Sequence, residues 1–326
     1  MIPFLPRKWP VQLLLKNDKA TTTIVLRFIY LPSYSEHKNK LYTRFAIPAN
    51  HFKSLIGVVC FSRHKMLPQK IFRTALLIAD KPVPKVIEHY GDYYAQFSRF
   101  LQKGVVSSKK QITLDIEPYD VTKMEYPSEQ ELFGTDGIVI TGSAASAYED
   151  IPWINCLVEF VSSIIDKHPK IRIVGICFGH QIIARARGGQ VIKNPLGWEV
   201  AVTEFSLTDI GKEVLKTDRK SVRLQEMHQD HVSSIPPGFS NIGFTEISPV
   251  QGMIKDDHVF TLQGHPEFVS GVVKEIVNVR HEKRIFSPEL AQKYLIAADY
   301  DVDDVWIGQK CVEFLTGGIE PDVIDS

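Results

Sequence analysis

Apolar and polar positions alternate between strand-like and helix-like periods from residue 71 onward. Residues 71–79 form a mostly apolar run that precedes a proline-rich turn, and residues 86–101 carry apolar side chains at helical spacing. Residues 112–116 alternate as a strand does, and residues 137–140 form a short apolar run typical of a buried strand. This order of strands and helices predicts a parallel sheet that is covered by helices on both faces.

The same alternation continues to the end of the chain. Further expected elements are helices over 153–166 and 178–187, a strand over 171–176, antiparallel strands over 200–205 and within 251–262, and helices over 272–284 and within 288–315. Residues 71–326 are therefore expected to form one α/β domain, with an open, mostly parallel sheet and helices on both of its faces.

The first seventy residues differ in pattern and in charge. They contain apolar patches at 11–15 and 23–30, but they show no sustained helical period and no clear order of strand, turn and strand. They hold twelve Lys and Arg residues against two acidic ones, whereas residues 71–326 hold 26 basic and 36 acidic residues. We therefore expect residues 1–70 to be a basic amino-terminal extension outside the core fold. A start of translation at Met66 is an alternative hypothesis.

The overall composition is that of an ordinary globular protein. The chain is 44% apolar with a formal net charge of +0 at pH 7, so no charge excess favours nucleic acid or a membrane surface as a partner. Its four cysteines (Cys60, Cys156, Cys177 and Cys311) form no CxxC pair, a pattern that suits separate thiols in a reducing compartment. The expected location is the cytoplasm, with the nucleus left open.

One of these cysteines lies in a turn that suits a nucleophile. Cys177 stands between a predicted buried strand and a predicted helix, with Gly175 and Gly179 two residues to either side. Glycines at these positions permit the sharp turn that lifts a nucleophile out of the end of a sheet. The amino terminus of the helix favours a thiolate, and the N–H of Phe178 would point toward an oxyanion. By itself, the pattern also fits an ordinary buried cysteine.

The wider context identifies the motif. Residues 175–181 read GICFGHQ, which closely resembles the GxCxGHQ nucleophile motif of class I glutamine amidotransferases, the family that includes the glutaminase domain of GMP synthase. The family's second motif, His-Pro-Glu, stands at His265-Pro266-Glu267, 88 residues after Cys177. The resemblance covers about residues 71–270. It implies the flavodoxin-like class I glutamine amidotransferase fold and a catalytic triad of Cys177, His265 and Glu267.

The chemistry explains why these residue types are needed. Cys177 must lose its proton to attack an amide carbonyl, and the departing ammonia must gain one. His265 can perform both transfers because an imidazole titrates near neutral pH. Glu267, two residues further along an extended segment, can hold the imidazole in the required tautomer.

Two further features of the sequence match the family. The sequence at 141–144, TGSA, resembles its oxyanion loop, which implies that an N–H of Gly142 or Ser143 joins that of Phe178 in binding an oxyanion. Many relatives have proline where this chain has Ala144, so the loop is expected to be less rigid. Gln181 matches the glutamine that positions the substrate.

No metal or organic cofactor is expected. His228 and His231 lie three residues apart beside one acidic residue, and such a pair is weak evidence for a metal site. A loop near the active site is the better interpretation of this run, which resembles a segment of the stand-alone, GMP-synthase-like branch of the family.

The sequence leaves three functions open. The main prediction is an amidotransferase that hydrolyses the γ-amide of glutamine through a γ-glutamyl thioester and releases ammonia to a separate synthetase or acceptor subunit. Neither a GxxxxGK[ST] nor an SGGxDS-type nucleotide loop is present, so ATP-dependent synthesis by this chain alone is not expected. The second function is a γ-glutamyl peptidase that acts on γ-glutamyl peptides or glutathione conjugates. The third is a non-catalytic regulatory protein, against which the intact triad argues.

Overall fold

The computed structural model describes residues 11–18, 21–28, 44–46 and 70–322. By its internal contacts the chain divides into two units, Met1–Leu67 and Pro68–Ser326. The hypothesis of a start at Met66 falls outside the described residues. None of the helices in the described part of the chain is long and apolar enough to cross a membrane.

The first unit contains a small antiparallel sheet that the sequence pattern did not predict. Strands β1 (Val11–Asp18) and β2 (Thr21–Phe28) pair along their whole length, and β3 (Arg44–Ala46) pairs with the other edge of β2. A hairpin of this kind depends on contacts between strands, so a search for a period along one strand can miss it.

The second unit is built on a nine-stranded sheet. Its strands lie in the order β10 (Ser221–His228), β9 (Glu199–Leu207), β12 (Ser240–Phe244), β13 (Gly252–Lys255), β14 (Val259–Leu262), β7 (Arg172–Ile176), β6 (Gly137–Ile140), β4 (Lys70–Ile78) and β5 (Ile112–Asp120). The strands from β14 to β5 pair in parallel, and those from β10 to β14 pair antiparallel. A separate antiparallel pair joins β8 (Gln190–Lys193) and β11 (Asp230–Ser234).

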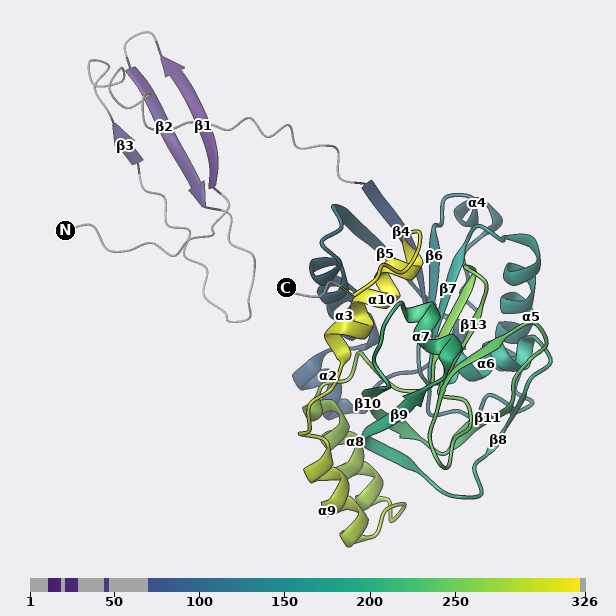
Figure 1. The fold of residues 1–326 in the computed structure, drawn as a ribbon. Coiled ribbons are helices and arrows are strands. Elements are labelled where there is room, and N and C mark those ends of the chain that lie inside the picture. Colours follow the sequence, from purple (N-terminus) through teal and green to yellow (C-terminus); the bar gives the residue numbers. More distant parts are fainter. Residues whose placement is uncertain (1–10, 19–20, 29–43, 47–69, 323–326) are drawn as a thin grey trace. The chain divides into compact units, whose positions relative to one another are not determined.

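Helices cover both faces of this sheet, as the sequence predicted (Figure 1). They are α2 (Pro84–Tyr90), α3 (Tyr93–Ser108), α4 (Glu129–Leu132), α5 (Pro152–Lys167), α6 (Phe178–Ala186), α7 (Asp209–Leu215), α8 (Ser270–Glu282), α9 (Pro288–Ala297) and α10 (Asp304–Leu315), with a 3₁₀ turn η2 at Val121–Lys123. Neighbouring residues of β4 serve opposite faces: Leu76 belongs to the core cluster of α3 and α10, and Leu77 to that of α5 and α6. The fold is therefore of the predicted α/β class.

The helix expected over residues 86–101 is divided into two helices in the structure. The helical spacing over residues 86–101 predicted a continuous element, but the structure ends α2 at Tyr90 and begins α3 at Tyr93. Gly91 has φ 82°, a conformation that favours glycine and breaks the helix. Asp92 then starts the new helix, because its side chain accepts a hydrogen bond from the N–H of Ala95 at 2.9 Å.

Candidate functional site

Cys177 occupies a sharp turn between β7 and α6. It is the N-cap residue of α6, with φ 52° and ψ −103°, a backbone conformation that is costly for a residue other than glycine. The flanking glycines allow strand and helix to approach closely. A Cβ on Gly179 would lie 2.5 Å from the carbonyl oxygen of Ile140, and one on Gly175 would lie 2.6 Å from Cδ1 of Ile183. The strand-turn-helix that the glycine spacing indicated is present.

His265 and Glu267 follow β14 and are buried next to this turn. The Nδ1 atom of His265 lies 2.7 Å from Oε1 of Glu267, so Nδ1–H donates to the carboxylate. Burial alone would lower the pKa of His265. The charge of an ionised Cys177, the charge of Glu267 and hydrogen bonds to both outweigh that effect and raise the pKa well above its ordinary value. The ring also stacks on Phe268, with centroids 4.1 Å apart, which fixes its plane.

Gly142 lies directly against the Cys177–His265 pair. A Cβ at this position would meet Cε1 of His265 at 2.8 Å and Cβ of Cys177 at 3.6 Å. Among the described residues, the backbone N–H groups of Gly142 and Ser143 have no hydrogen-bond acceptor. Phe178 is the first residue of α6, where a backbone N–H has no partner within the helix. These three N–H groups are therefore not used in hydrogen bonds among the described residues.

The loop at residues 141–144, in which an oxyanion site was predicted, is held by Asp80, a residue that sequence reasoning missed. Oδ2 of Asp80 accepts a hydrogen bond from the N–H of Ala144 at 2.7 Å and one from Oγ of Ser143 at 3.4 Å. A proline at position 144 has no N–H and could not make the first of these bonds. The carboxylate therefore supplies a constraint on the loop that we had expected this chain to lack. In the sequence, Asp80 was marked only by its position directly after the first predicted strand.

Replacing Asp80 with alanine is expected to lower kcat by roughly tenfold, because a hydrogen bond to a charged group contributes on the order of 1.5–3 kcal/mol and part of it would be lost from loop positioning. KM should change less, because Asp80 holds the loop but does not itself line the pocket. Steady-state hydrolysis of a γ-glutamyl amide measures both constants. Asp80→Asn, which keeps one oxygen acceptor, is the matched control and should lose less. An unchanged kcat in Asp80→Ala would contradict this role.

His228, Glu199 and Glu226 form a buried polar cluster. Nε2 of His228 lies 3.0 Å from Oε2 of Glu199 and 3.4 Å from Oε2 of Glu226, although the ring nitrogen is not aligned for a hydrogen bond. Glu199 also accepts hydrogen bonds from two neutral side chains. Burial, and then the charge of Glu199, raises the pKa of Glu226 well above its usual range. In the part of the chain that the structure describes, no group of three or more His, Cys, Asp or Glu residues could hold a metal ion.

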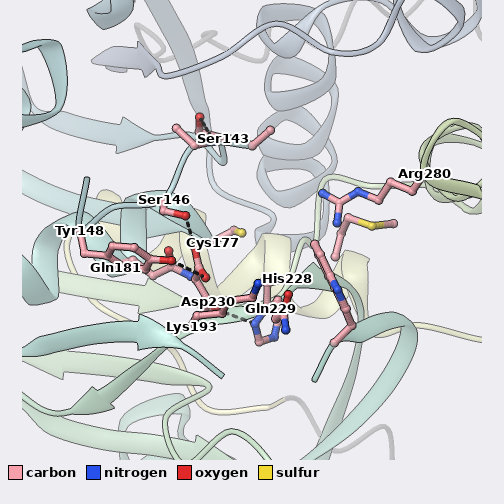
Figure 2. A pocket seen from close by; sticks show the side chains of 14 residues that line it. Ser143, Ser146, Tyr148, Cys177, Gln181, Lys193, His228, Gln229, Asp230 and Arg280 are labelled. Atoms are coloured by element: carbon pink, nitrogen blue, oxygen red, sulfur yellow. Dashed lines mark hydrogen bonds between the residues drawn. The ribbon is translucent and has the colours of Figure 1, made fainter. Parts of the chain in front are cut away.

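A pocket of about 190 Å³ opens beside Cys177 (Figure 2). It is lined by Ser143, Ala144, Ala145, Ser146, Tyr148, Cys177, Gln181, Lys193, Trp198, Met227, His228, Gln229, Asp230 and Arg280. Of the predicted site residues, Cys177, Ser143 and Gln181 belong to this lining, whereas His265 and Glu267 do not. The side chain of Gln181 donates to the carbonyl oxygen of Asp230 at 2.9 Å, so it shapes one end of the pocket.

The two ends of the pocket differ in charge. In Figure 2, Tyr148, Ser146 and Asp230 lie on one side of Cys177, and Arg280 lies on the other. The hydroxyl groups of Ser146 and Tyr148 both donate to the carboxylate of Asp230. Sequence reasoning expected the run that contains Asp230 to lie near the active site, but it assigned no role to Asp230 itself or to Arg280.

Known proteins resemble this chain along most of the second unit. The family model "Glutamine amidotransferase class-I" matches residues 89–279. A glutamine amidotransferase-like protein of Schizosaccharomyces pombe is 37% identical over 246 residues, which are 75% of this chain and 98% of the relative. Gamma-glutamyl peptidase 2 of Arabidopsis thaliana is 30% identical over 256 residues, or 76% and 98% of the two chains. The crystal structure of a glutamine amidotransferase from Thermotoga maritima shares the fold, with a TM-score of 0.59 at 18% identity over 76% of this chain and 99% of that one. The chain therefore belongs to the class I glutamine amidotransferase family, as its two sequence motifs indicated.

Proposed function

We propose that the protein is an enzyme that hydrolyses γ-glutamyl amide bonds through a thioester on Cys177. One observation carries the proposal: the buried His265–Glu267 pair, 2.7 Å apart, adjoins a cysteine at the amino terminus of α6 whose φ is 52°. This arrangement has a nucleophile, a base and a group that orients the base.

The reaction proceeds in two halves. The carbonyl oxygen of the substrate lies toward the N–H of Phe178 and that of Gly142 or Ser143, and Sγ of Cys177 attacks the carbonyl carbon. The imidazolium of His265 gives its proton to the leaving amine as the C–N bond breaks, which leaves a γ-glutamyl thioester. Water then loses a proton to His265 and attacks the thioester, releasing glutamate and the thiolate. Every step uses groups of this chain, so the scheme requires no metal or organic cofactor.

The glutamyl part of the substrate fits the end of the pocket beside Gln181. Asp230 carries a negative charge there, and Lys193 lines the same pocket with a positive one. These charges complement the α-amino and α-carboxylate groups that every γ-glutamyl compound presents. Opposite charges at one end thus orient the substrate with its γ-carbonyl toward Cys177.

Two substrate classes remain candidates within this chemistry. Glutamine would release ammonia to a separate synthetase or acceptor subunit, whereas a γ-glutamyl peptide would release an amino acid or peptide to water. The peptidase is supported by the relative named gamma-glutamyl peptidase and by the pocket lining, which includes Arg280 as well as Cys177. The cytoplasmic location and the status of residues 1–70 as a separate extension remain predictions. The expectation that the protein binds neither nucleic acid nor membranes remains a prediction as well.

The test is release of glutamate by the purified full chain from glutamine and from γ-glutamyl dipeptides in parallel. Preference for the dipeptides would support the peptidase, and preference for glutamine would support the amidotransferase. No release from either substrate, with and without candidate acceptor subunits, would contradict the proposal if a glutamine-like electrophile also failed to label Cys177.

Replacing Glu267 with glutamine is expected to move the alkaline limb of the pH–rate profile to lower pH. The carboxylate contributes to the raised pKa of His265, so its removal lowers that pKa and the imidazolium that protonates the leaving amine is lost earlier as pH rises. The loss of rate at neutral pH should be smaller than in His265→Ala, which removes the base itself. The measurement is kcat/KM from pH 5 to 10. An alkaline limb at the wild-type position would show that Glu267 does not act on His265.

A further inference from the structure

Arg280 lies at one end of the pocket, and in the described part of the chain no carboxylate pairs with it. In the described part of the chain its side chain forms no salt bridge and no hydrogen bond, and its Nη1 is fully buried without an acceptor. The pocket places it in the same lining as Cys177, and Figure 2 shows its guanidinium directed toward the space beside Sγ. Burying a charged group without a partner is costly, so such a group commonly awaits an anion.

Aromatic rings hold this guanidinium in place. Cζ of Arg280 lies 4.2 Å from the centre of the Trp198 ring and 5.9 Å from that of Phe286, and the two rings meet edge to face with centroids 5.5 Å apart. The rings contact the face of the guanidinium, so the N–H groups on its pocket side remain able to donate hydrogen bonds. A guanidinium fixed in this way can bind a carboxylate with two parallel hydrogen bonds.

The position of Arg280 indicates which carboxylate it would bind. The γ-carbonyl carbon of the substrate must lie at Cys177, and its two substituents extend in different directions from it. Asp230 and Lys193 complement the glutamyl head on one side, and Arg280 lies on the opposite side of Cys177 from Asp230 (Figure 2). The leaving group therefore extends toward Arg280. Glutamine releases ammonia, which carries no negatively charged group that could bind Arg280.

We infer that Arg280 binds a carboxylate on the leaving group, and that the preferred substrates are γ-glutamyl peptides in which the residue after the γ-glutamyl bond provides that carboxylate. This inference rests on the proposed function and specifies its substrate class. Arg280 acts as a specificity-determining residue: it contacts the part of the substrate that departs as an amino acid or peptide. A cation at this place discriminates against glutamine and against γ-glutamyl amides with neutral leaving groups.

The experiment compares two ligands of nearly the same shape, γ-glutamylglycine and γ-glutamylglycinamide, which differ in the charge of the leaving group. Binding is measured by calorimetry on the full chain with Cys177→Ala, so that neither ligand is consumed. We expect the anionic ligand to bind more tightly. Adding Arg280→Gln should weaken its binding by roughly ten- to a hundredfold, the range for loss of a hydrogen bond between charged groups, and should leave the neutral ligand unchanged. Arg280→Lys should retain part of the preference.

Arg284→Gln is the matched control. Arg284 lies two residues beyond the end of α8, is exposed and does not line the pocket, so this change should alter neither affinity. The same two ligands are then used as substrates for two chains that retain Cys177: the wild type and Arg280→Gln. Because any effect of Arg280 on the thiolate of Cys177 acts on both substrates, it cancels in the ratio of their kcat/KM values.

The outcomes separate the inference from the proposed function. Equal affinity of the two ligands for the Cys177→Ala chain, or an equal loss of both on Arg280→Gln, would overturn the role of Arg280. If both substrates are hydrolysed and Arg280→Gln leaves the ratio of their kcat/KM values unchanged, the role of Arg280 is overturned while the proposed hydrolase activity is supported. Selective binding of the anionic ligand without turnover by the otherwise wild-type chain would support Arg280 and contradict the proposed function.

Discussion

Replacement of Cys177 by alanine is expected to reduce glutamate release by on the order of 10⁴-fold or more, which leaves only the residual rate that substrate binding and the oxyanion donors can support. The change removes only the thiol that forms the thioester, and the other residues of the site cannot replace that bond. The fold should persist, because the turn is maintained by the close approach of Gly175 and Gly179 to their neighbours and not by the sulfur. Alanine also occupies less space than cysteine, so no contact is strained.

Cys156→Ala is the matched control, since Cys156 is a half-buried free cysteine on α5 that does not line the pocket. It should retain full activity. Thermal unfolding of both variants separates loss of chemistry from loss of fold. Residual turnover by Cys177→Ala within tenfold of the wild type would rule out a thioester on this residue.

Replacement of Gly142 by alanine is expected to lower kcat by roughly 10²–10³-fold, the effect typical of losing an oxyanion donor. The added Cβ would lie 2.8 Å from Cε1 of His265, closer than carbon atoms approach without displacement. Either His265 must turn away from Cys177 or the loop must withdraw its N–H groups. Both adjustments damage the transition state more than the bound substrate, so KM should change much less than kcat.

Gly134→Ala is the control for this substitution. A Cβ on Gly134 would meet only the end of the flexible Arg73 side chain, at 3.0 Å, and one carbonyl oxygen at 3.6 Å. This variant should keep its kcat. If Gly142→Ala were as active as the wild type, the loop could not lie against His265 as it does here, and the proposed oxyanion site would be wrong.

The sequence by itself determined the features that depend on short-range patterns. The glycines two residues either side of Cys177 specify a turn that only residues without a Cβ can pack, and the apolar runs around it specify the strand and helix that it joins. The prediction of His265 and Glu267 came from the resemblance of the His-Pro-Glu run, 88 residues after Cys177, to the family's second motif. The structure brings the two side chains to 2.7 Å from each other. The α/β class followed from the alternating periods of these elements.

Only the tertiary structure decided which single charges belong to the site. Asp80 lies 97 residues before Cys177 and Arg280 lies 103 after it, and neither has a distinctive local context. Asp80 meets the loop after β6 because β4 and β6 are parallel neighbours, so that residues following both strands emerge at the same edge of the sheet. Arg280 reaches the pocket because α8 packs its last turn against Trp198. Contacts of this kind arise from the packing of distant segments, and a period along the chain does not encode them.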